Sequence, residues 1–370
     1  MKSTVVFLLF SIVLLSPVLV QARNIAPQTD GPRLTCRAAL LMDLHSGQVL
    51  WEKNGYVRRA PASTTKIVTA YMGIMEAKPH QVIKVSQKAA WTEGSRLHIV
   101  AGSKYYLKDL LTGLMMRSGN DAAVAIAEGL AGDVPHFAHR MNVLVQRLGA
   151  FNSHFENPNG LPAKGHYSSA MDLATITHIA LQDARFRAIV SQKSAQVHSL
   201  DGRIRMVNNT NRLLWTYPGA IGVKTGTTRA AGRCLVSAAE RQGFGLVAVV
   251  LKAADRWGDS ERLLDYGYSH FQAIQRLQAG EIVAHVPVNL GPQKSVEAVV
   301  EHALYHVVPK NAQQIRVQIN LPAQLLAPVH KGDRIGSATL MVDGLAVART
   351  PILANNSAIK RSWWQRFFKI

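Results

Sequence analysis

Three short clusters of polar residues carry the side chains that nucleophilic catalysis needs. The first is Ser-Thr-Thr-Lys at positions 63–66, which follows Pro61 at the start of an apolar-periodic helix. Residues three apart share a helix face, so Lys66 can take the proton of the Ser63 hydroxyl, a weak nucleophile without a base. Burial or a neighbouring cation would lower the lysine pKa enough for this role. The cluster predicts a covalent acyl-enzyme at Ser63, although Ser-x-x-Lys also occurs by chance in helices.

The second cluster is Ser-Gly-Asn at positions 118–120, which interrupts the helical pattern between residues 107–116 and the next helix from Ala122. At such a corner Ser118 can relay a proton, and Asn120 can hold a substrate amide. A simple turn between two helices explains the same residues. Taken alone, this cluster does not indicate a site.

The third cluster is Lys-Thr-Gly at positions 224–226, which follows an apolar run near the expected end of a strand and precedes Thr227. Lys224 supplies a cation and Thr225 a hydroxyl for an anionic group, while Gly226 lets a substrate backbone approach closely. A hairpin turn without a ligand is the ordinary alternative. The three clusters occur in order, each where its role requires, and chance explains the whole set poorly.

The elements that must position these clusters follow from hydrophobic periodicity. Strand-like runs cover residues 38–43, 48–51, 220–223, 233–238 and 244–251, and helical patterns cover 61–128 and 260–277. Turns at 45–47 and 242–243 each join two of these strands. Strands at both ends of a helical insertion predict an α+β fold, an antiparallel sheet covered by helices. Beyond residue 280, short runs at 282–288, 314–319 and 339–342 predict a small all-β domain.

The two ends of the chain differ from its interior. Lys2 precedes an apolar run from Val5 to Val20, and a small-residue cleavage pattern closes at Ala22. Residues 1–22 are therefore predicted to be a signal peptide, which places the mature chain outside the cytoplasm. Residues 355–370 are predicted to be an amphipathic segment that lies on a membrane surface. This segment mixes aromatic with basic side chains: Trp363, Trp364, Phe367, Phe368, Lys360, Arg361, Arg366 and Lys369.

The amino-acid composition limits the classes of partner that this protein is expected to bind. The chain has 42 Lys and Arg against 23 Asp and Glu, a formal net charge of +19. In an exported protein this balance favours anionic lipid or an anionic polymer, and no motif for nucleic acid supports that class of partner. Two cysteines, Cys36 and Cys234, do not make a disulfide-dense scaffold. Without CxxC or HExxH patterns, we expect no metal.

The order Ser-x-x-Lys, Ser-x-Asn, Lys-Thr-Gly resembles the active-site-serine penicillin-binding enzymes and serine β-lactamases. Further segments are similar to the low-molecular-mass D-alanyl-D-alanine carboxypeptidases of that superfamily. They are Asn157–Leu161 (NPNGL), His166–Ser168 (HYS) and Pro328–Asp333 (PVHKGD), the last within the β-rich region that β-lactamases lack. Arg256 matches an arginine that pairs with the substrate's terminal carboxylate in this family, although by chemistry alone a surface arginine fits equally well.

The resemblance implies removal of the terminal D-alanine from peptidoglycan pentapeptide stems, without a metal or an organic cofactor. It also implies acylation by β-lactams, which mimic the scissile amide. Ser63 would attack, Lys66 would take its proton with help from Lys224, and Ser118 would pass it to the departing D-alanine. Backbone amides of Ser63 and Thr227 would form the oxyanion hole. The implied organisation is a catalytic domain at 23–278, a β-rich domain at 279–354 and a peripheral anchor at 355–370 on the outer, periplasmic face of the cytoplasmic membrane.

Three alternatives stay open. A D,D-endopeptidase that cleaves peptidoglycan cross-links would use the same residues. A β-lactamase is disfavoured because no deacylating glutamate motif stands between the second and third clusters; Glu156 precedes Asn157 and Pro158 instead. A non-catalytic envelope scaffold would bind wall polymer through its basic surface.

The family's sheet order also implies that Cys36 and Cys234 are unbridged, because another strand would separate their strands.

Overall fold

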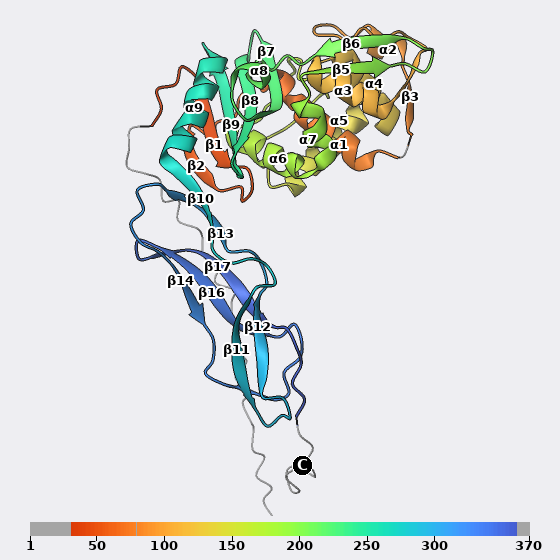
Figure 1. Ribbon diagram of the computed structural model, residues 1–370. Coiled ribbons are helices and arrows are strands. Elements are labelled where there is room, and N and C mark those ends of the chain that lie inside the picture. The colour runs from red at the N-terminus through yellow and green to blue at the C-terminus, as the bar shows by residue number, and fades with distance from the viewer. Residues whose placement is uncertain (1–30, 79, 361–370) are drawn as a thin grey trace, which may run out of the picture.

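The computed structural model describes residues 31–78 and 80–360. The predicted signal peptide lies outside the described residues, as do residues 361–370 of the predicted C-terminal segment. Within the described ranges the chain forms a helix-covered sheet followed by a β-rich region that extends away from it (Figure 1).

A five-stranded antiparallel sheet organises the first part of the chain, with strand order β2-β1-β9-β8-β7. Its strands are β1 (Ala38–Asp43), β2 (Val49–Lys53), β7 (Ala220–Thr228), β8 (Gly232–Arg241) and β9 (Phe244–Ala253). The predicted hairpins around 45–47 and 242–243 are confirmed by the β1–β2 and β8–β9 pairings. The strand predicted to end at Val223 continues through the Lys-Thr-Gly cluster to Thr228, because that whole segment pairs with β8.

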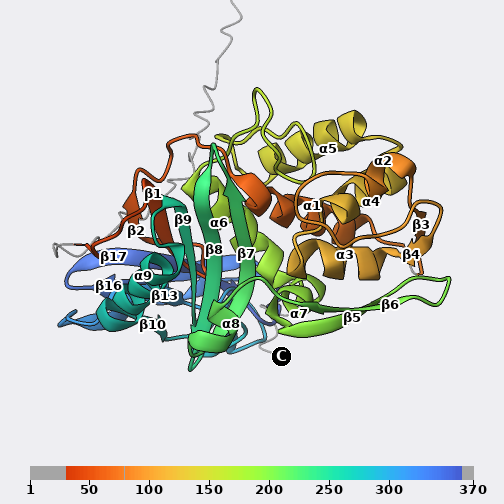
Figure 2. The same cartoon turned by 90° about the horizontal axis from the view of Figure 1, so that it is seen from above.

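Both faces of this sheet are buried. Leu40 and Val249 belong to the core shared with the helical insertion, while their neighbours Leu41 and Val250 belong to a second core under α9 (Arg256–His270). Side chains alternate along a strand, so burial on both faces requires the near-continuous apolar runs found in the sequence. Figure 2 shows α9 on one side of the sheet and α6 on the other.

The helical insertion between β2 and β7 carries all the described helices other than α9, and α1 to α5 gather beside β7 in Figure 2. The helices of the insertion are η1 (Ala62–Thr65), α1 (Lys66–Glu76), α2 (Gln87–Ala90), α3 (Leu107–Met116), α4 (Asn120–Ala131), α5 (Val134–Arg147), α6 (Ala170–Gln182), α7 (Ala184–Ser191) and α8 (Leu213–Thr216). Two small hairpins flank them, β3 (Val82–Lys84) with β4 (Lys104–Tyr106), and β5 (Ser194–His198) with β6 (Ile204–Asn208). Buried apolar faces of α1, α3 and α4 pack into one core with the sheet.

The observed helix α9 differs at both ends from the helix predicted at 260–277. It begins earlier, at Arg256, because the Asp255 carboxylate caps it by accepting a hydrogen bond from the Gly258 amide at 3.1 Å. It ends at His270, and the chain turns into strand β10 (Phe271–Gln275). This strand pairs with β13 (Tyr305–Pro309), a partner about thirty residues away in the sequence that helical periodicity does not reveal.

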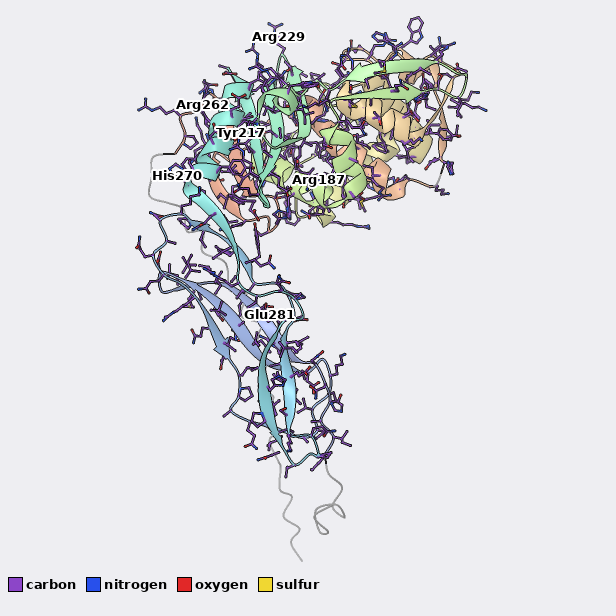
Figure 3. The ribbon with its side chains drawn as sticks, viewed as in Figure 1. Arg187, Tyr217, Arg229, Arg262, His270 and Glu281 are labelled. Atoms are coloured by element: carbon purple, nitrogen blue, oxygen red, sulfur yellow. The ribbon has the colours of Figure 1, made fainter. Side chains whose placement is uncertain are left out.

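The β-rich region contains a six-stranded sheet of order β14-β16-β17-β12-β11-β15. Its strands are β11 (Ile282–Asn289), β12 (Ser295–Val300), β14 (Ile315–Asn320), β15 (Leu325–Leu326), β16 (Arg334–Val342) and β17 (Leu345–Ala354). The prediction that the chain beyond residue 280 is rich in β-strands is confirmed. Figure 3 marks the path between the two regions: Arg229 lies at the far end of the helix-covered sheet, His270 at the end of α9, and Glu281 further down.

Hydrogen bonds between strand β13 and the β1–β2 hairpin hold the two regions together. Tyr305 donates a hydrogen bond from its hydroxyl to Asp43 at 2.9 Å. The Gln48 side chain donates to the Val307 carbonyl at 3.0 Å and accepts from the Val307 amide at 3.1 Å. The β-rich region is therefore attached at the β1–β2 hairpin, on the opposite side of the sheet from Arg229 (Figure 3).

The described part of the C-terminal segment belongs to the β-rich region. Ala358 is fully buried and forms a β-bridge with Val329, and the Asn355 amide donates to the Glu297 carbonyl. Among the described helices none has both the length and the apolar character needed to cross a bilayer. Cys36 and Cys234 are both free, and β9 lies between β1, which follows Cys36, and β8, which contains Cys234.

Candidate active site

Ser63 and Lys66 lie together, as their spacing predicts. Ser63 is in the 3-10 turn η1, Lys66 begins α1, and the Lys66 Nζ lies 3.0 Å from the Ser63 Oγ. Ser63 is half-buried, whereas Lys66 is among the largest fully buried side chains. The nucleophile therefore has an accessible hydroxyl and a base held away from water.

Two further oxygens fix the amine. Lys66 Nζ is 2.7 Å from the Asn120 Oδ1 and 2.6 Å from the backbone carbonyl of Asn159. A neutral amine has two N–H donors and one lone pair, so it can donate to these two oxygens and accept the Ser63 O–H. The surroundings thus match the proton-accepting form of lysine.

Electrostatics favour the same form. Burial, followed by the charge of Lys224, holds the pKa of Lys66 well below its usual value, and Asp121 opposes this shift. Lys224 is also buried, and burial followed by the charge of Arg256 lowers its pKa to about 7. Desolvation and a neighbouring cation both disfavour the ammonium, so the site lowers the proton affinity of both lysines by the two mechanisms expected from the sequence.

The Ser-Gly-Asn cluster forms the corner between α3 and α4, as its position in the sequence predicts. Asn120 opens α4 and spans the site, because its Oδ1 contacts Lys66 while its Nδ2 donates to the Glu93 carbonyl at 2.6 Å. Ser118 is buried and has a φ of 60°. Within the described residues the Ser118 Oγ makes no side-chain hydrogen bond, so its proton-relay role stays a prediction.

The segment 157–166 forms a wall of the site that residue chemistry alone did not assign. Besides the Asn159 carbonyl, the Pro158 carbonyl accepts a hydrogen bond from Thr69 Oγ1 at 2.6 Å. Gly160 has a φ of 84°, and a Cβ there would overlap the carbonyl of Ala62. Only glycine allows this close approach. The Asn-Pro-Asn-Gly pattern was noted as a resemblance, but nothing in it indicates that a backbone carbonyl would receive the lysine.

His166 holds the same wall against the nucleophile turn. Its Nδ1 accepts from the Glu156 amide at 3.1 Å, which leaves the proton on Nε2, 2.9 Å from the Thr65 Oγ1. Burial, followed by the charge of His154, lowers the pKa of His166 to about 4. The imidazole is therefore neutral near pH 7 and links segment 157–166 to the residue that precedes Lys66.

Strand β7 forms the opposite wall. Gly226 is so close to η1 that an added Cβ would lie 3.1 Å from the Ser63 amide nitrogen. Thr225 Oγ1 lies 3.0 Å from the Thr210 Oγ1, and the Lys224 Nζ donates to the Thr225 carbonyl at 3.0 Å. The backbone of the third cluster thus passes directly beside the nucleophile. Thr210 is a contact that no motif indicated.

Arg256 reaches the same strand from the first turn of α9. Its Nη1 donates to the Thr227 Oγ1 at 2.8 Å and to the Gly226 carbonyl at 3.1 Å. The guanidinium also stacks on the Trp257 ring, 4.8 Å from the centroid, and its Nε is buried without a partner. The structure therefore brings Arg256 to the end of the Lys-Thr-Gly cluster, where a carboxylate of a bound peptide can meet a fixed cation.

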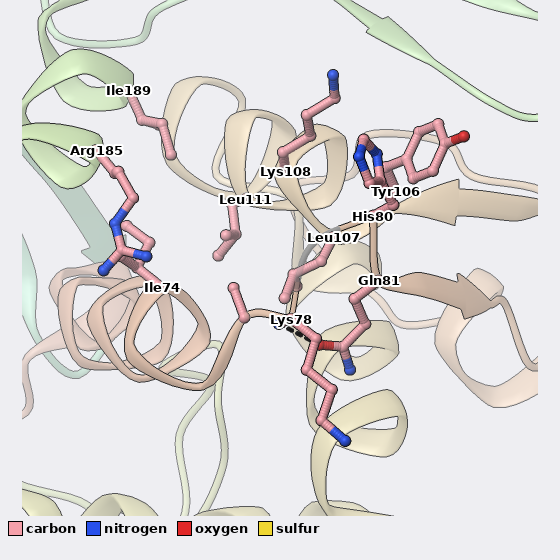
Figure 4. Close-up of a pocket in the computed structure, with 11 residues that line it drawn as sticks. Ile74, Lys78, His80, Gln81, Tyr106, Leu107, Lys108, Leu111, Arg185 and Ile189 are labelled. Atoms are coloured by element: carbon pink, nitrogen blue, oxygen red, sulfur yellow. Dashed lines mark hydrogen bonds between the residues drawn. The ribbon is translucent and has the colours of Figure 1, made fainter.

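An apolar cavity of about 430 Å³ lies elsewhere in the helical insertion, between α1, α3 and α7. Figure 4 shows Leu107 and Leu111 facing it, with Lys78, Lys108 and Arg185 around it. None of the residues in the three clusters lines it. The Ser63 site is therefore the better candidate active site, because the lining of the apolar cavity does not pair a nucleophile with a buried base.

The arrangement has known counterparts. A family model described as D-alanyl-D-alanine carboxypeptidase matches residues 25–255. The chain belongs to this family. A second model, the C-terminal domain of penicillin-binding protein 5, matches residues 271–360. The chain is thus a serine peptidase of the D-alanyl-D-alanine carboxypeptidase family.

Individual relatives match this chain over most of its length. The chain is 32% identical to the D-alanyl-D-alanine carboxypeptidase DacF of Bacillus subtilis, over 92% of this chain and 91% of the relative. It is 31% identical to the D-alanyl-D-alanine carboxypeptidase DacA of Escherichia coli K12, over 89% of this chain and 85% of the relative. The crystal structure of penicillin-binding protein 5 from Haemophilus influenzae superposes with a TM-score of 0.79 at 30% identity, covering 90% of this chain and all of that one. These likenesses confirm the predicted fold and family.

Proposed function

We propose that this protein removes the terminal D-alanine from peptidoglycan pentapeptide stems through an acyl-enzyme on Ser63. The single observation that carries the proposal is the contact between the Ser63 Oγ and a fully buried, triply coordinated Lys66 amine. Family membership supports the reaction class, and the geometry supports the assignment of roles to residues.

In the acylation step, the Ser63 Oγ attacks the carbonyl carbon of the penultimate D-alanine while its proton passes to the Lys66 Nζ. The Ser63 and Thr227 amides stabilise the oxygen that becomes negative, and donors of this kind typically contribute about 10²–10³ in rate. Collapse of the tetrahedral intermediate breaks the C–N bond. Ser118, beside Asn120 at the corner of α4, delivers the proton from Lys66 to the departing amine.

In the deacylation step, a water molecule attacks the Ser63 ester. Its proton passes to Lys66, the ester C–O bond breaks, and Ser63 regains a proton as the shortened peptide leaves with a new carboxylate. The same neutral amine serves both halves of the reaction. No cofactor is needed for either step, because proton transfer and oxyanion stabilisation come from the chain itself.

The substrate carboxylate is held at the end of β7. Arg256 and the Thr225 hydroxyl present donors there, and Lys224 lies beneath them in the buried layer. The Thr227 hydroxyl positions Arg256, because it accepts a hydrogen bond from Nη1 while donating to the Gly226 carbonyl. This end of the cleft selects peptides with a free terminal carboxylate. Asn120 then aligns the peptide backbone with its second Nδ2 hydrogen, while the first stays on the Glu93 carbonyl.

The test is to incubate the mature protein with a monomeric pentapeptide muropeptide and with a cross-linked dimer, and to follow both by mass spectrometry. We expect release of D-alanine from the monomer. Release of monomers from the dimer, with the pentapeptide untouched, would assign a D,D-endopeptidase instead. The Ser63→Ala variant is the control, and turnover by it would contradict the mechanism.

The domain and location assignments are part of the same proposal. We propose export by the signal peptide at 1–22, a catalytic domain from 23 to about 278, a β-rich domain over 279–354, and peripheral attachment to an anionic membrane surface by the C-terminal segment. Because residues 355–358 pack into the β-rich region, the membrane-facing part begins beyond them. The β-rich region would then separate the catalytic site from the membrane surface.

A further inference from the structure

A small basic pocket lies between the 96–98 loop, the end of α3 and strand β6. Its volume is about 150 Å³, and its lining includes Arg96, His98, Arg117 and Arg205 but no acidic residue. Arg96 and His98 come from the loop before β4, Arg117 from the end of α3, and Arg205 from strand β6. Three separate segments therefore bring cations to one hollow.

The same segments also build the catalytic site. The 93–98 loop supplies the Glu93 and Ser95 carbonyls that bind Asn120. Arg117 directly precedes Ser118. Asn208, which also lines the pocket, lies two residues before Thr210, whose hydroxyl contacts Thr225. Each wall of the pocket therefore continues into a residue of the cleft.

Within the described part of the chain, no carboxylate forms an ion pair with the three arginines of this pocket. The ion pairs among the described residues include none of Arg96, Arg117 and Arg205. The Arg96 Nε is buried without a partner. Asp121 carboxylate oxygens are near the loop, but they accept from the Leu97 and Ile99 amides and so hold the loop in place. Like charges brought together repel, and a bound anion would relieve that repulsion.

We propose that this basic pocket binds a free carboxylate on the stem peptide, at a position N-terminal to the D-Ala-D-Ala end. The inference rests on the proposed function, because it takes the occupant to be the substrate already in the cleft. Arginine is suited to the task, since its planar guanidinium donates two parallel hydrogen bonds to a carboxylate. The pocket would thereby select stems with that carboxylate free over stems in which it is amidated.

The test compares Arg205→Gln with a matched control on the same hairpin. Arg203→Gln also removes one positive charge, but Arg203 is paired with Asp201 and does not line the pocket. Two pentapeptides ending in D-Ala-D-Ala are used, one with a free carboxylate N-terminal to that end and one with the same group amidated. For Arg205→Gln the ratio of kcat/KM for the acid to that for the amide should fall about tenfold, the usual effect of one charged hydrogen bond. Arg203→Gln should leave the ratio unchanged.

A binding arm keeps this inference separate from turnover. In a Ser63→Ala background, calorimetry should show tighter binding of the acid peptide than of the amide, and Arg205→Gln should remove the difference. If wild type releases no D-alanine but this binding difference persists, the proposed function fails and the pocket stands. The pocket assignment would be overturned if Arg205→Gln lowered kcat/KM equally for both peptides, or if Arg203→Gln changed the acid-to-amide ratio as much as Arg205→Gln does. It would also be overturned if the pocket bound a phosphodiester polymer in place of the acid peptide.

Discussion

Replacing Lys66 with methionine isolates the contribution of the buried amine. Methionine approximates the volume of the lysine stem but offers neither a base for Ser63 nor a donor. Loss of positioned proton transfer typically lowers a rate by about 10²–10⁴, which equals about 3–5 kcal/mol of activation free energy. We therefore expect acylation by a fluorescent penicillin, followed by stopped-flow fluorescence, to slow by at least about 100-fold.

The same substitution has two opposing effects on stability. The Asn120 Oδ1 and the Asn159 carbonyl lose their donor, and each buried orphaned acceptor typically costs about 1–3 kcal/mol. Removal of a fully buried amine offsets part of this loss. Circular dichroism and thermal unfolding should show a folded protein, and Lys88→Met, at an exposed lysine of α2, is the matched control. Acylation of folded Lys66→Met within tenfold of wild type would refute the assignment of the base.

Three further predictions concern other groups. Lys224 has a pKa of about 7 in the folded state against 10.5 in the unfolded state, so the unfolded state binds more protons between these values and stability should rise with pH there. The free energy of unfolding in urea should therefore be measured for wild type and for Lys224→Met, and the difference between them should increase by about 2 kcal/mol from pH 7 to pH 9. A difference that does not change with pH would contradict the lowered pKa of Lys224. Arg256→Ala should impair turnover of peptides with a free terminal carboxylate more than of terminally amidated analogues, whereas equal impairment would make Arg256 an ordinary surface residue. Truncation after Lys360, which spares buried Ala358, should leave penicillin acylation intact but abolish sedimentation with anionic vesicles at low salt; unchanged sedimentation would exclude the tail as the anchor.

Local spacing was enough to predict the contact between Ser63 and Lys66, because three residues along a helical turn fix the geometry. It also located the Ser118 corner, where one helical pattern stops and another starts. Sequence could not reveal that the Asn159 carbonyl completes the amine's shell, since the two residues are 93 positions apart and a carbonyl has no residue signature. The Thr210 contact with Thr225 was missed for a similar reason.

The fold was predicted best where two paired strands follow one another in the sequence, as in the β1–β2 and β8–β9 hairpins. The apolar pattern failed at β10, because Phe271–Gln275 reads as a continuation of α9 until its pairing with Tyr305–Pro309 is known. The start of α9 was misplaced for a smaller reason. The Asp255 cap was present in the sequence, but the polar first turn hid it from an analysis based on hydrophobic periodicity.

The central claim is that Ser63 is the nucleophile, and peptide mapping after reaction with benzylpenicillin tests it most directly. Intact mass should rise by one penicilloyl group per chain, and digestion should place that group on the peptide containing Ser63. The Ser63→Ala variant should remain unmodified under the same conditions while keeping the wild-type circular dichroism spectrum. Labelling of the variant, or a penicilloyl group mapped to another residue of the wild type, would contradict the account.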